Sequence, residues 1–508
     1  MRTAMTLLLC AGLGLWPLGT RAGAQNRLRT QVESYVDSHQ QEIVRELADL
    51  LAIPDVAADR ENIRRKALRL QTLFSARGFE ARLLETDGNP LVYAQFQVSG
   101  ATQTLLLYCH YDGQPVDPSS WRQDDPFVPI LRAGKMEDDP SSLGDPRKRE
   151  RYEPDWRIYA RSASDDTSPI VGLLAAFDAL KAAGRAPTSN LRVILDGEEE
   201  AGSSSLVSAI GRYKDLLAAD LMVILDGPVH QSNRPTVVFG ARGIQTVQLT
   251  VYGPRFSLHS GHYGNWVPNP AQRLARLLAS MKGDDGRVTL DGFYDGITIP
   301  DQELAIMRQV PDDEAGLLEL FGIAEPDRVG PSLQEARNYP SLNVRGMRSG
   351  WVEDDVRTIV PDLAIAEIDI RLILETPPEV MRDKLRAHLQ KEGYHVTETE
   401  PTVQERARYP RLVRMVARDG TRAYRTSMSN PLASRLVAAL EEMWDQPPVR
   451  LRTSGGTVPI SPFIEALGFP AVNLPTVNFD NNQHSPDENL RLGHFFAGIN
   501  SIAALLAM

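Results

Sequence analysis

Five short motifs in the sequence carry histidine and carboxylate groups of the kinds that bind metal ions. The first is His110-Tyr111-Asp112, and in a strand its first and third side chains point to the same side. An imidazole is a good zinc ligand, and a carboxylate behind it can fix its orientation. Because a lone His-x-Asp pair is more often structural, its significance depends on what the other motifs add.

The other motifs are acidic or contain a single histidine: Ser164-Asp165-Asp166, Glu198-Glu199-Glu200, Asp226 and His484. Each also has a structural interpretation. Paired acids at a helix start are usually caps, a run of glutamates usually marks a solvated turn, and isolated Asp or His residues are usually structural. In the glutamate run, one residue could bind a metal while its neighbour acts as a general base.

The position of these motifs along the chain favours metal binding. Most of them follow a short apolar segment that is predicted to be a buried strand: Gln103–Cys109, Leu191–Leu195, Leu221–Leu225 and Ala471–Leu474, with Arg157–Ala160 as a weaker candidate. Ligands bind at the carboxyl ends of strands in open α/β sheets. These nitrogen and oxygen donors suit zinc, with manganese or cobalt as alternatives, and a shared carboxylate would hold two ions about 3.5–4 Å apart.

Alternating strands and helices predict an α/β domain with a mainly parallel core sheet, in which Ser168 caps a helix over residues 169–183. After residue 242, half-buried strands at Gln245–Tyr252 and Ala364–Leu372 indicate a smaller, inserted α+β domain. The chain returns to the first domain at a helix over Pro431–Trp444. We therefore expect catalytic segments at residues 25–241 and 429–508 and an inserted domain at residues 242–428.

The composition is that of a soluble globular protein: of 508 residues, 42% are hydrophobic and 24% charged, and the net charge is −11. That charge argues against nucleic acid or an anionic membrane surface as a partner. The sequence has no phosphate-binding glycine loop and no Gly-x-Ser-x-Gly motif, which argues against a nucleotide enzyme and a serine hydrolase.

The first residues are predicted to be a signal peptide, residues 1–24. Arg2 precedes an apolar stretch, Leu7–Leu18, that is too short to span a bilayer, and Ala22-Gly23-Ala24 is a small-x-small cleavage signal. The mature protein would begin near Gln25 and be periplasmic or secreted, without a stable membrane span; an uncleaved anchor is the alternative. Only Cys109 would then remain, so the protein would fold without an internal disulfide.

The ordered motifs resemble the di-zinc metallopeptidase family, which includes carnosinase-type dipeptidases, glutamate carboxypeptidases, aminoacylases and succinyl-diaminopimelate desuccinylase. The similarity covers essentially the whole mature chain and is greatest to the carnosinase-like branch. It extends to four further segments: Gly240-Ala241-Arg242-Gly243, Leu258-His259-Ser260-Gly261, Ile370-Arg371-Leu372 and Ser454-Gly455-Gly456-Thr457-Val458-Pro459. The resemblance implies a parallel-sheet catalytic domain with an inserted lid.

The resemblance also implies a ligand set for two zinc ions in each subunit. Asp165 would bridge the two ions, with His110 and Asp226 completing one site and Glu200 and His484 the other. The peptide bond between Asp165 and the next residue would be cis.

Catalytic and substrate-binding roles follow from the same resemblance. Glu199 would be the general base that deprotonates a metal-bridging water, and Asp112 would orient the histidine two residues before it. His259, in the lid domain, would stabilise the oxyanion in the active site of a partner subunit, which implies a homodimer through the lid. Three residues would hold the substrate's carboxylate: Arg371, Gly456 and Thr457.

The sequence departs from the family pattern at four places. Ala160-Arg161-Ser162 stands where the family usually has Gly-Arg-Gly, and Thr167-Ser168 stands where it has Lys-Gly. The polar segment at residues 134–157 is longer than usual, and we expect a surface loop that reshapes the cleft mouth. A substrate-lining histidine of the dipeptidase branch has no counterpart near Arg418, which weakens the argument for dipeptide specificity more than the argument for hydrolysis.

The sequence therefore predicts an exported two-metal hydrolase that cleaves an amide bond in a small peptide, as a dipeptidase or carboxypeptidase. Its nucleophile would be a metal-bridged hydroxide, and Glu199 would be the base. A deacylase acting on N-acyl amino acids would use the same metals with a different pocket. A third hypothesis is a peptide-binding protein that has lost catalysis, although every expected ligand and the base are present.

Overall fold

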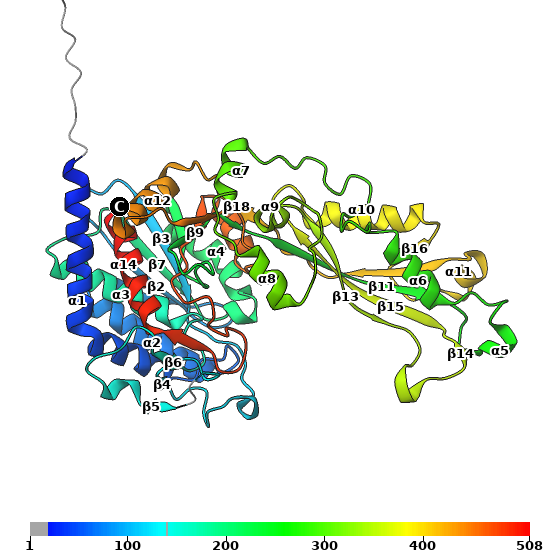
Figure 1. Cartoon of the computed structure of the whole chain (residues 1–508), viewed down its shortest axis with the longest axis horizontal. Coiled ribbons are helices and arrows are strands. Elements are labelled where there is room, and N and C mark those ends of the chain that lie inside the picture. Colours follow the sequence, from blue (N-terminus) through cyan, green and yellow to red (C-terminus); the bar gives the residue numbers. More distant parts are fainter. Residues whose placement is uncertain (1–18, 139–140) are drawn as a thin grey trace, which may run out of the picture.

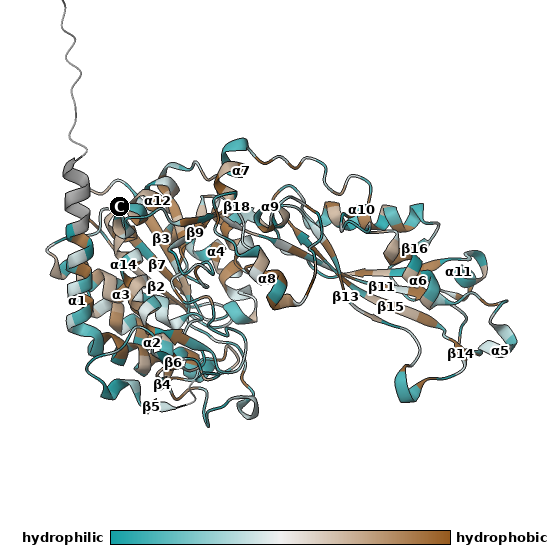
Figure 2. Cartoon of the chain, in the orientation of Figure 1, coloured by the Kyte–Doolittle hydropathy of each residue, from teal (hydrophilic) through white to brown (hydrophobic). Residues whose placement is uncertain are grey.

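The computed structural model describes residues 19–138 and 141–508. Figure 1 shows two lobes side by side. The larger lobe, on the left, surrounds an eight-stranded sheet, and the smaller lobe, on the right, surrounds a five-stranded sheet. Figure 2 shows that apolar residues, in brown, fill the strands of the larger lobe and the C-terminal helix beside them.

The eight-stranded sheet has the order β1-β2-β7-β3-β8-β20-β9-β19. The four strands at its centre, β7, β3, β8 and β20, are all parallel to one another. Antiparallel pairs join β1, β2 and β7, so the sheet is mixed at this edge. Its parallel centre confirms the predicted mainly parallel α/β fold. The bounds are β1 Glu80–Leu84, β2 Leu91–Phe96, β3 Thr104–His110, β7 Asn190–Asp196, β8 Leu221–Ile224, β9 Thr236–Val238, β19 Val449–Leu451 and β20 Ala471–Asn473.

Helices cover both faces of this sheet. Alternate strand residues such as Leu105 and Leu107 pack against one group of helices: α1 Gly19–Leu51, α2 Arg60–Ala76, α3 Thr167–Ala182, α12 Pro431–Trp444 and α14 Leu492–Ala507. The intervening residues, such as Leu106 and Tyr108, pack against α4 Ser204–Leu217 and α13 Ser461–Leu467. Burial of both faces explains why these strands are continuously apolar in the sequence.

Helix α3 begins earlier than the sequence predicted. Its N-cap is Asp166, and Ser168 lies inside the first turn, so the prediction that Ser168 caps the helix is wrong. The start is fixed by a tertiary contact, because the Asp166 carboxylate accepts a hydrogen bond from the backbone N–H of His110 at 3.1 Å. The bond between Asp165 and Asp166 is cis, as the family resemblance implied.

The segment at residues 134–157 is partly ordered into a small sheet, contrary to the expectation of a plain surface loop. This four-stranded sheet has the order β21-β6-β4-β5, with bounds β4 Ile130–Arg132, β5 Ser142–Gly144, β6 Arg157–Tyr159 and β21 Asn489–Arg491. The described residues after it contact α1: Tyr152 N donates to Gln40 Oε1 at 3.2 Å, and Arg151 Nη1 to Asp37 O at 2.9 Å. This part of the segment therefore packs against α1, which lies on the left in Figure 1.

The smaller lobe is the inserted α+β unit. Its sheet has the order β13-β15-β11-β17-β16, and α6 and α10 pack on its apolar face. The bounds are β11 Gly243–Tyr252, β13 Ser341–Arg348, β15 Leu363–Leu372, β16 His395–Thr397, β17 Leu412–Ala417, α6 Pro270–Ala279, α10 Pro378–Lys391 and α11 Val403–Arg408. Its far end carries a short ladder and a helical turn: β12 Leu258–His259, β14 Ile359–Val360 and α5 Ser260–Tyr263.

Two short strands and three helices lie where the lobes meet. β10 Gly240–Ala241 pairs with β18 Tyr424–Arg425, so the two segments that connect the lobes run side by side. Helix α7 Asp301–Met307 contacts β19, and Val310 beyond it packs against the end of the large sheet. Helices α8 Glu314–Phe321 and α9 Leu333–Arg337 follow at the junction, as Figure 1 shows.

The predicted leader falls mostly on residues 1–18, outside the described residues. Helix α1 begins at Gly19 and runs through the predicted cleavage site. Within residues 19–138 and 141–508, every helix is too short or too polar to cross a bilayer.

Candidate metal centre

The candidate ligands meet at one edge of the large sheet. His110 ends β3, Glu199 and Glu200 follow β7 in a 3₁₀ turn, and Asp226 is the second residue after β8. His484 lies in the loop after β20. Because β7, β3, β8 and β20 are adjacent and parallel, their carboxyl ends open toward a single region.

Asp165 lies at the centre of the cluster, in the connection before α3. Its Oδ1 is 2.9 Å from His110 Nε2 and its Oδ2 is 3.0 Å from His484 Nε2. Two groups of side chains have all their ligand atoms within 4.8 Å of one another, and Asp165 belongs to both. The first group adds His110 and Asp226, and the second adds Glu200 and His484.

The donors fit two metal ions of the zinc type. Each group offers one imidazole nitrogen and two carboxylates, a set that suits zinc, manganese or cobalt. The shared carboxylate, Asp165, is buried, and its Oδ2 has no properly oriented hydrogen bond although an imidazole is near. A buried carboxylate oxygen that lacks a hydrogen-bond donor and lies beside two histidines is expected of a residue that bridges two metal ions.

The electrostatics also call for cations. Burial and the charge of Asp165 raise the pKa of Glu200 to about 7 and that of Asp226 to about 6. Burial likewise raises the pKa of Glu199, and the neighbouring acids add to it. Burial opposes ionisation of Asp165 too, but the adjacent imidazoles of His110 and His484 hold its pKa below the usual value. Positive charge at this place would stabilise all four carboxylates.

Asp112 joins two of the motifs. Its Oδ1 accepts a hydrogen bond from Glu199 N at 3.0 Å, and its Oδ2 accepts one from Glu200 N at 3.1 Å. The same carboxylate lies 3.4 Å from His110 Nδ1, which is also 3.0 Å from the Asp112 carbonyl oxygen. Asp112 thus sets the imidazole and the glutamate turn relative to each other.

Glu488 is a buried acid that the sequence analysis did not identify. One carboxylate oxygen accepts from Ser164 N and Asp165 N at 2.9 and 3.0 Å, and the other accepts from Ser162 N at 3.0 Å and Arg161 Nη1 at 2.7 Å. Glu488 therefore fixes the altered loop before α3. Its only signal in the sequence is its place, four residues after His484 and directly before a short strand.

A buried ion pair supports the same loop from the other side. Lys66, in α2, donates to Asp55 Oδ2 at 2.5 Å and to Thr167 Oγ1 at 2.8 Å. Thr167 replaces the family's lysine after the acid pair, so here α2 supplies the ammonium group at this position. Sequence reasoning missed Lys66 because it lies one hundred and one residues from its partner Thr167.

The remaining predicted residues lie away from the metal-ligand cluster. Arg371 Nη1 donates to Thr457 Oγ1 at 2.9 Å, so a strand of the lid contacts the turn that holds Gly456. His259 is exposed at the far end of the lid, beside β14 and α5 at the right of Figure 1. Within one chain, His259 does not join the metal cluster.

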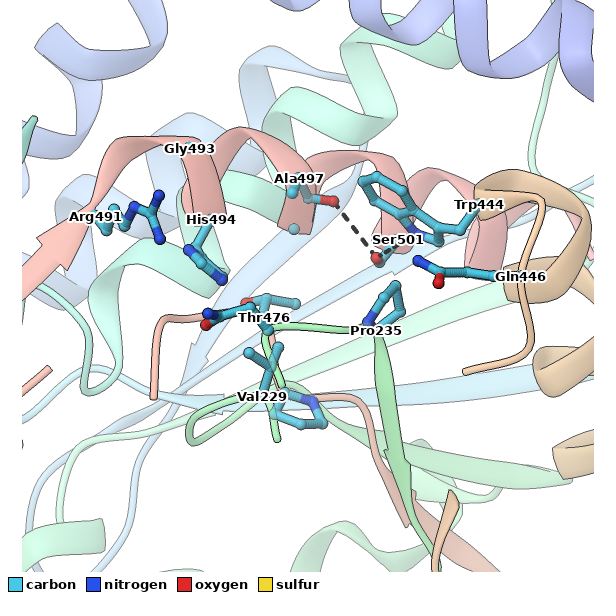
Figure 3. Close-up of a pocket in the computed structure, with 13 residues that line it drawn as sticks. Val229, Pro235, Trp444, Gln446, Thr476, Arg491, Gly493, His494, Ala497 and Ser501 are labelled. Atoms are coloured by element: carbon cyan, nitrogen blue, oxygen red, sulfur yellow. Dashed lines mark hydrogen bonds between the residues drawn. The ribbon is translucent and has the colours of Figure 1, made fainter. Parts of the chain in front are cut away.

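A separate cavity of about 440 Å³ lies behind the loops of Asp226 and His484. Figure 3 shows Val229, Thr476, His494 and Trp444 on its walls. A bridge between Pro228 and Val477 joins the two loops there. The lining includes none of the candidate ligands, so this cavity is not part of the metal centre.

Comparisons with known proteins identify the family of this chain. Residues 138–508 match the family described as Peptidase family M20/M25/M40. The chain is 25% identical over 502 residues to the Cys-Gly metallodipeptidase DUG1 of Saccharomyces cerevisiae, across 94% of this chain and 97% of that protein. It is 23% identical over 505 residues to the Beta-Ala-His dipeptidase of Homo sapiens, across 94% and 92% of the two chains.

A solved structure of an M20 family enzyme is also similar to this chain. The chain is similar to an M20 family metallo-carboxypeptidase from Sulfolobus solfataricus, with a TM-score of 0.71 and 28% identity, covering 92% of this chain and 98% of that one. These matches confirm the family resemblance and the carnosinase-like branch that the motifs indicated.

The contacts of Glu488 generate a prediction about metal binding. Glu488→Gln replaces one acceptor oxygen with a donor and should misplace Asp165 and the loop before it. We expect metal affinity to fall about 10- to 100-fold, as for other residues that orient metal ligands. Competition with a chelator measures this. The control Glu150→Gln, at an exposed position, should leave affinity unchanged; equal affinity in the two variants would refute the role of Glu488.

Proposed function

Because the chain belongs to peptidase family M20/M25/M40 and is a metallopeptidase, we propose that it is an exported, zinc-dependent dipeptidase with two metal ions per subunit. The observation that carries this proposal is the shared carboxylate, Asp165, between two groups of histidine and carboxylate donors. His110 and Asp226 would complete one site, and Glu200 and His484 the other. When bound, the two ions supply an acidified water and polarise the substrate's carbonyl group.

Glu199 is the proposed general base. It lies in the turn between the two ligand groups, and its backbone is held by Asp112. Its carboxylate is not needed as a ligand in either group, so it is free to accept the proton of the attacking water. Burial raises its pKa, which also suits a group that must later give the proton to the leaving amine.

Arg371 and the Gly456-Thr457 turn are proposed to hold the substrate's terminal carboxylate. Their contact already brings a guanidinium group to a turn without bulky side chains, and a Cβ on Gly456 would meet no atom within 4 Å. A site that holds the terminal carboxylate at a fixed place would limit the length of the substrate. The relatives' names, which specify Cys-Gly and β-Ala-His substrates, favour a dipeptide.

We also propose a homodimer through the lid. The far end of the lid exposes several large apolar side chains, including Trp266 at 82% exposure; the others are Phe256, Val352 and Val356. Exposed apolar groups gathered in this way are typical of interaction surfaces. His259 stands on the same end, so a partner subunit's His259 would be available to stabilise the oxyanion.

The proposed reaction predicts a specific loss in one variant. The zinc-loaded protein should hydrolyse dipeptides, and Glu199→Gln should lower kcat by about 10²- to 10⁴-fold, because no group then accepts the proton. The variant should still bind two equivalents of zinc, as measured by metal analysis. Normal turnover in Glu199→Gln would rule out this base.

A substrate panel separates the competing functions. It should contain dipeptides, longer peptides and N-acyl amino acids, each tested with and without a chelator. Preference for N-acyl amino acids would identify a deacylase, and zinc binding without hydrolysis of any substrate would identify a binding protein.

Subunit mixing tests the role of His259. His259→Ala and Glu199→Gln should each be inactive, but heterodimers contain one site with both residues intact. Random exchange of subunits should therefore restore about a quarter of the wild-type activity. His262→Ala, at a neighbouring exposed histidine, is the matched control and should stay active without mixing. No recovery in the mixture would contradict a site shared between subunits.

Export generates its own prediction. When the full chain is expressed in a cell with a general secretion pathway, mass spectrometry of the product outside the cytoplasm should find an N-terminus at Gln25. Ala24→Arg, which disrupts the small-x-small signal, should leave the leader attached. A product that stays in the cytoplasm with Met1 or Arg2 at its N-terminus would contradict the proposed leader.

A further inference from the structure

Three arginine side chains gather where the lid meets the catalytic lobe. Arg242 precedes β11, Arg337 ends α9, and Arg371 lies in β15. Ser341 is paired with Arg371 across the sheet and accepts a hydrogen bond from Arg242 Nη2 at 3.1 Å. Burial and the charges of Arg371 and Arg337 lower the pKa of Arg242 to about 10, so the three cations act on one another.

Two of these arginines reach the same turn. Arg371 donates to Thr457, and Arg337 Nε lies 3.9 Å from the position that a Cβ on Gly455 would take. The turn carries two glycines at this point, so its surface is open between the guanidinium groups. It is also the turn to which we assigned the substrate's terminal carboxylate.

Other arginines at the junction have carboxylate partners. Arg425 contacts Glu375 at 2.5 Å, and Arg452 contacts Glu303 at 2.6 Å. At these two positions a carboxylate offsets the charge of the arginine.

Arg242 and Arg337 lack such partners. Arg242 is only 8% exposed, yet it donates to neutral oxygens, and its Nε has no acceptor. Over residues 19–138 and 141–508, the side chain of Arg337 has no hydrogen bond or ion pair. Arg242 is buried and Arg337 is half-buried, and a guanidinium group shielded from water without a carboxylate is costly unless a ligand supplies the negative charge.

The three guanidinium groups outnumber the two nearby carboxylates, Asp369 and Asp312, by one. Asp369, 3.6 Å from Arg371, balances one of the three guanidinium groups. Asp312 acts on the charge of Arg337, but its two oxygens are already bonded to other side chains: His230 and Gln334. A cavity of about 250 Å³ is lined by both Arg242 and Arg337, together with Lys282 and Asp327, so open space lies beside both of these arginines.

We propose that Arg337, supported by Arg242, binds a carboxylate on the side chain of the substrate's C-terminal residue, so that the enzyme favours dipeptides ending in Glu or Asp. The inference rests on the proposed function, in which Arg371 and Thr457 hold the main-chain carboxylate. A dicarboxylic residue brings a second carboxylate, which would pair with Arg337 while the main-chain carboxylate contacts Arg371. Arg337 and Arg371 contact one turn, so a single residue can reach both.

Kinetics with paired substrates test this. The zinc-loaded protein should cleave Ala-Glu with a kcat/KM at least about tenfold above that of Ala-Gln, which has the same shape without the charge. Arg337→Met should bring this ratio close to one, and Arg337→Lys should restore part of it. Arg328→Met is the matched control, because Arg328 lies on the same segment but is exposed and paired with Glu325; its ratio should equal that of the wild type.

Binding of free amino acids gives a readout that does not need turnover. By calorimetry, the zinc-loaded protein should bind L-glutamate about tenfold more tightly than L-glutamine, and Arg337→Met should remove the difference. Circular dichroism establishes that the variant is folded; if it is not, Arg337→Gln takes its place in both measurements.

The outcomes are distinguishable. Equal values for the acidic and neutral compounds in the wild type, or a preference that persists in the folded Arg337 variants, would overturn the inference while dipeptide hydrolysis still supports the proposed function. An Arg337-dependent preference for L-glutamate without any peptide hydrolysis would support the anion site and refute the dipeptidase.

Discussion

Four carboxylates in one buried place are the constraint on which the rest of this structure depends. Asp165, Glu199, Glu200 and Asp226 each raise the cost of ionising the others, and burial adds to it. Two histidines alone cannot offset that charge at neutral pH. Cations bound at this place would stabilise the ionised form of these acids, so the affinity for metal follows from the arrangement of the acids.

Holding such groups in place requires contacts from outside the cluster. The parallel strands bring the ligands to one edge, but a strand end does not fix a side chain to a fraction of an ångström. That precision comes from polar contacts: Asp112 ties the glutamate turn to β3, and Glu488 collects the backbone donors around Asp165. Both carboxylates are fully buried, so no water competes for their hydrogen bonds.

The sequence predicted the strand-end residues because local patterns encode them. A continuous apolar run indicates a buried strand, and the polar residue that follows it, His110 or Asp226, marks where the strand ends. Sequence patterns did not predict Glu488 or Lys66. The partner of Glu488, Asp165, lies hundreds of residues away in the chain, and the partner of Lys66, Thr167, lies about a hundred residues away. Nothing near Glu488 or Lys66 in the sequence signals that its side chain is buried. The start of α3 was misplaced for the same reason, since its N-cap is set by a contact with β3. The location of His259, far from the cluster in its own chain, likewise follows from tertiary structure alone.

The charges of the two lobes explain how one orientation of a substrate can be selected. The catalytic lobe contributes carboxylates that attract metal ions, and the lid side contributes unpaired guanidinium groups. Tyr424, in the strand pair between them, is buried, and the charge of Asp226 raises its pKa further, so the field of the acids extends into this junction. In the proposed function, the anionic end of a peptide would be attracted by Arg371 and its neighbours, which would leave its amide toward the metals. The same polarity requires that an arginine at the junction remain unpaired in the free protein, because an internal acid would occupy the place of the substrate's carboxylate.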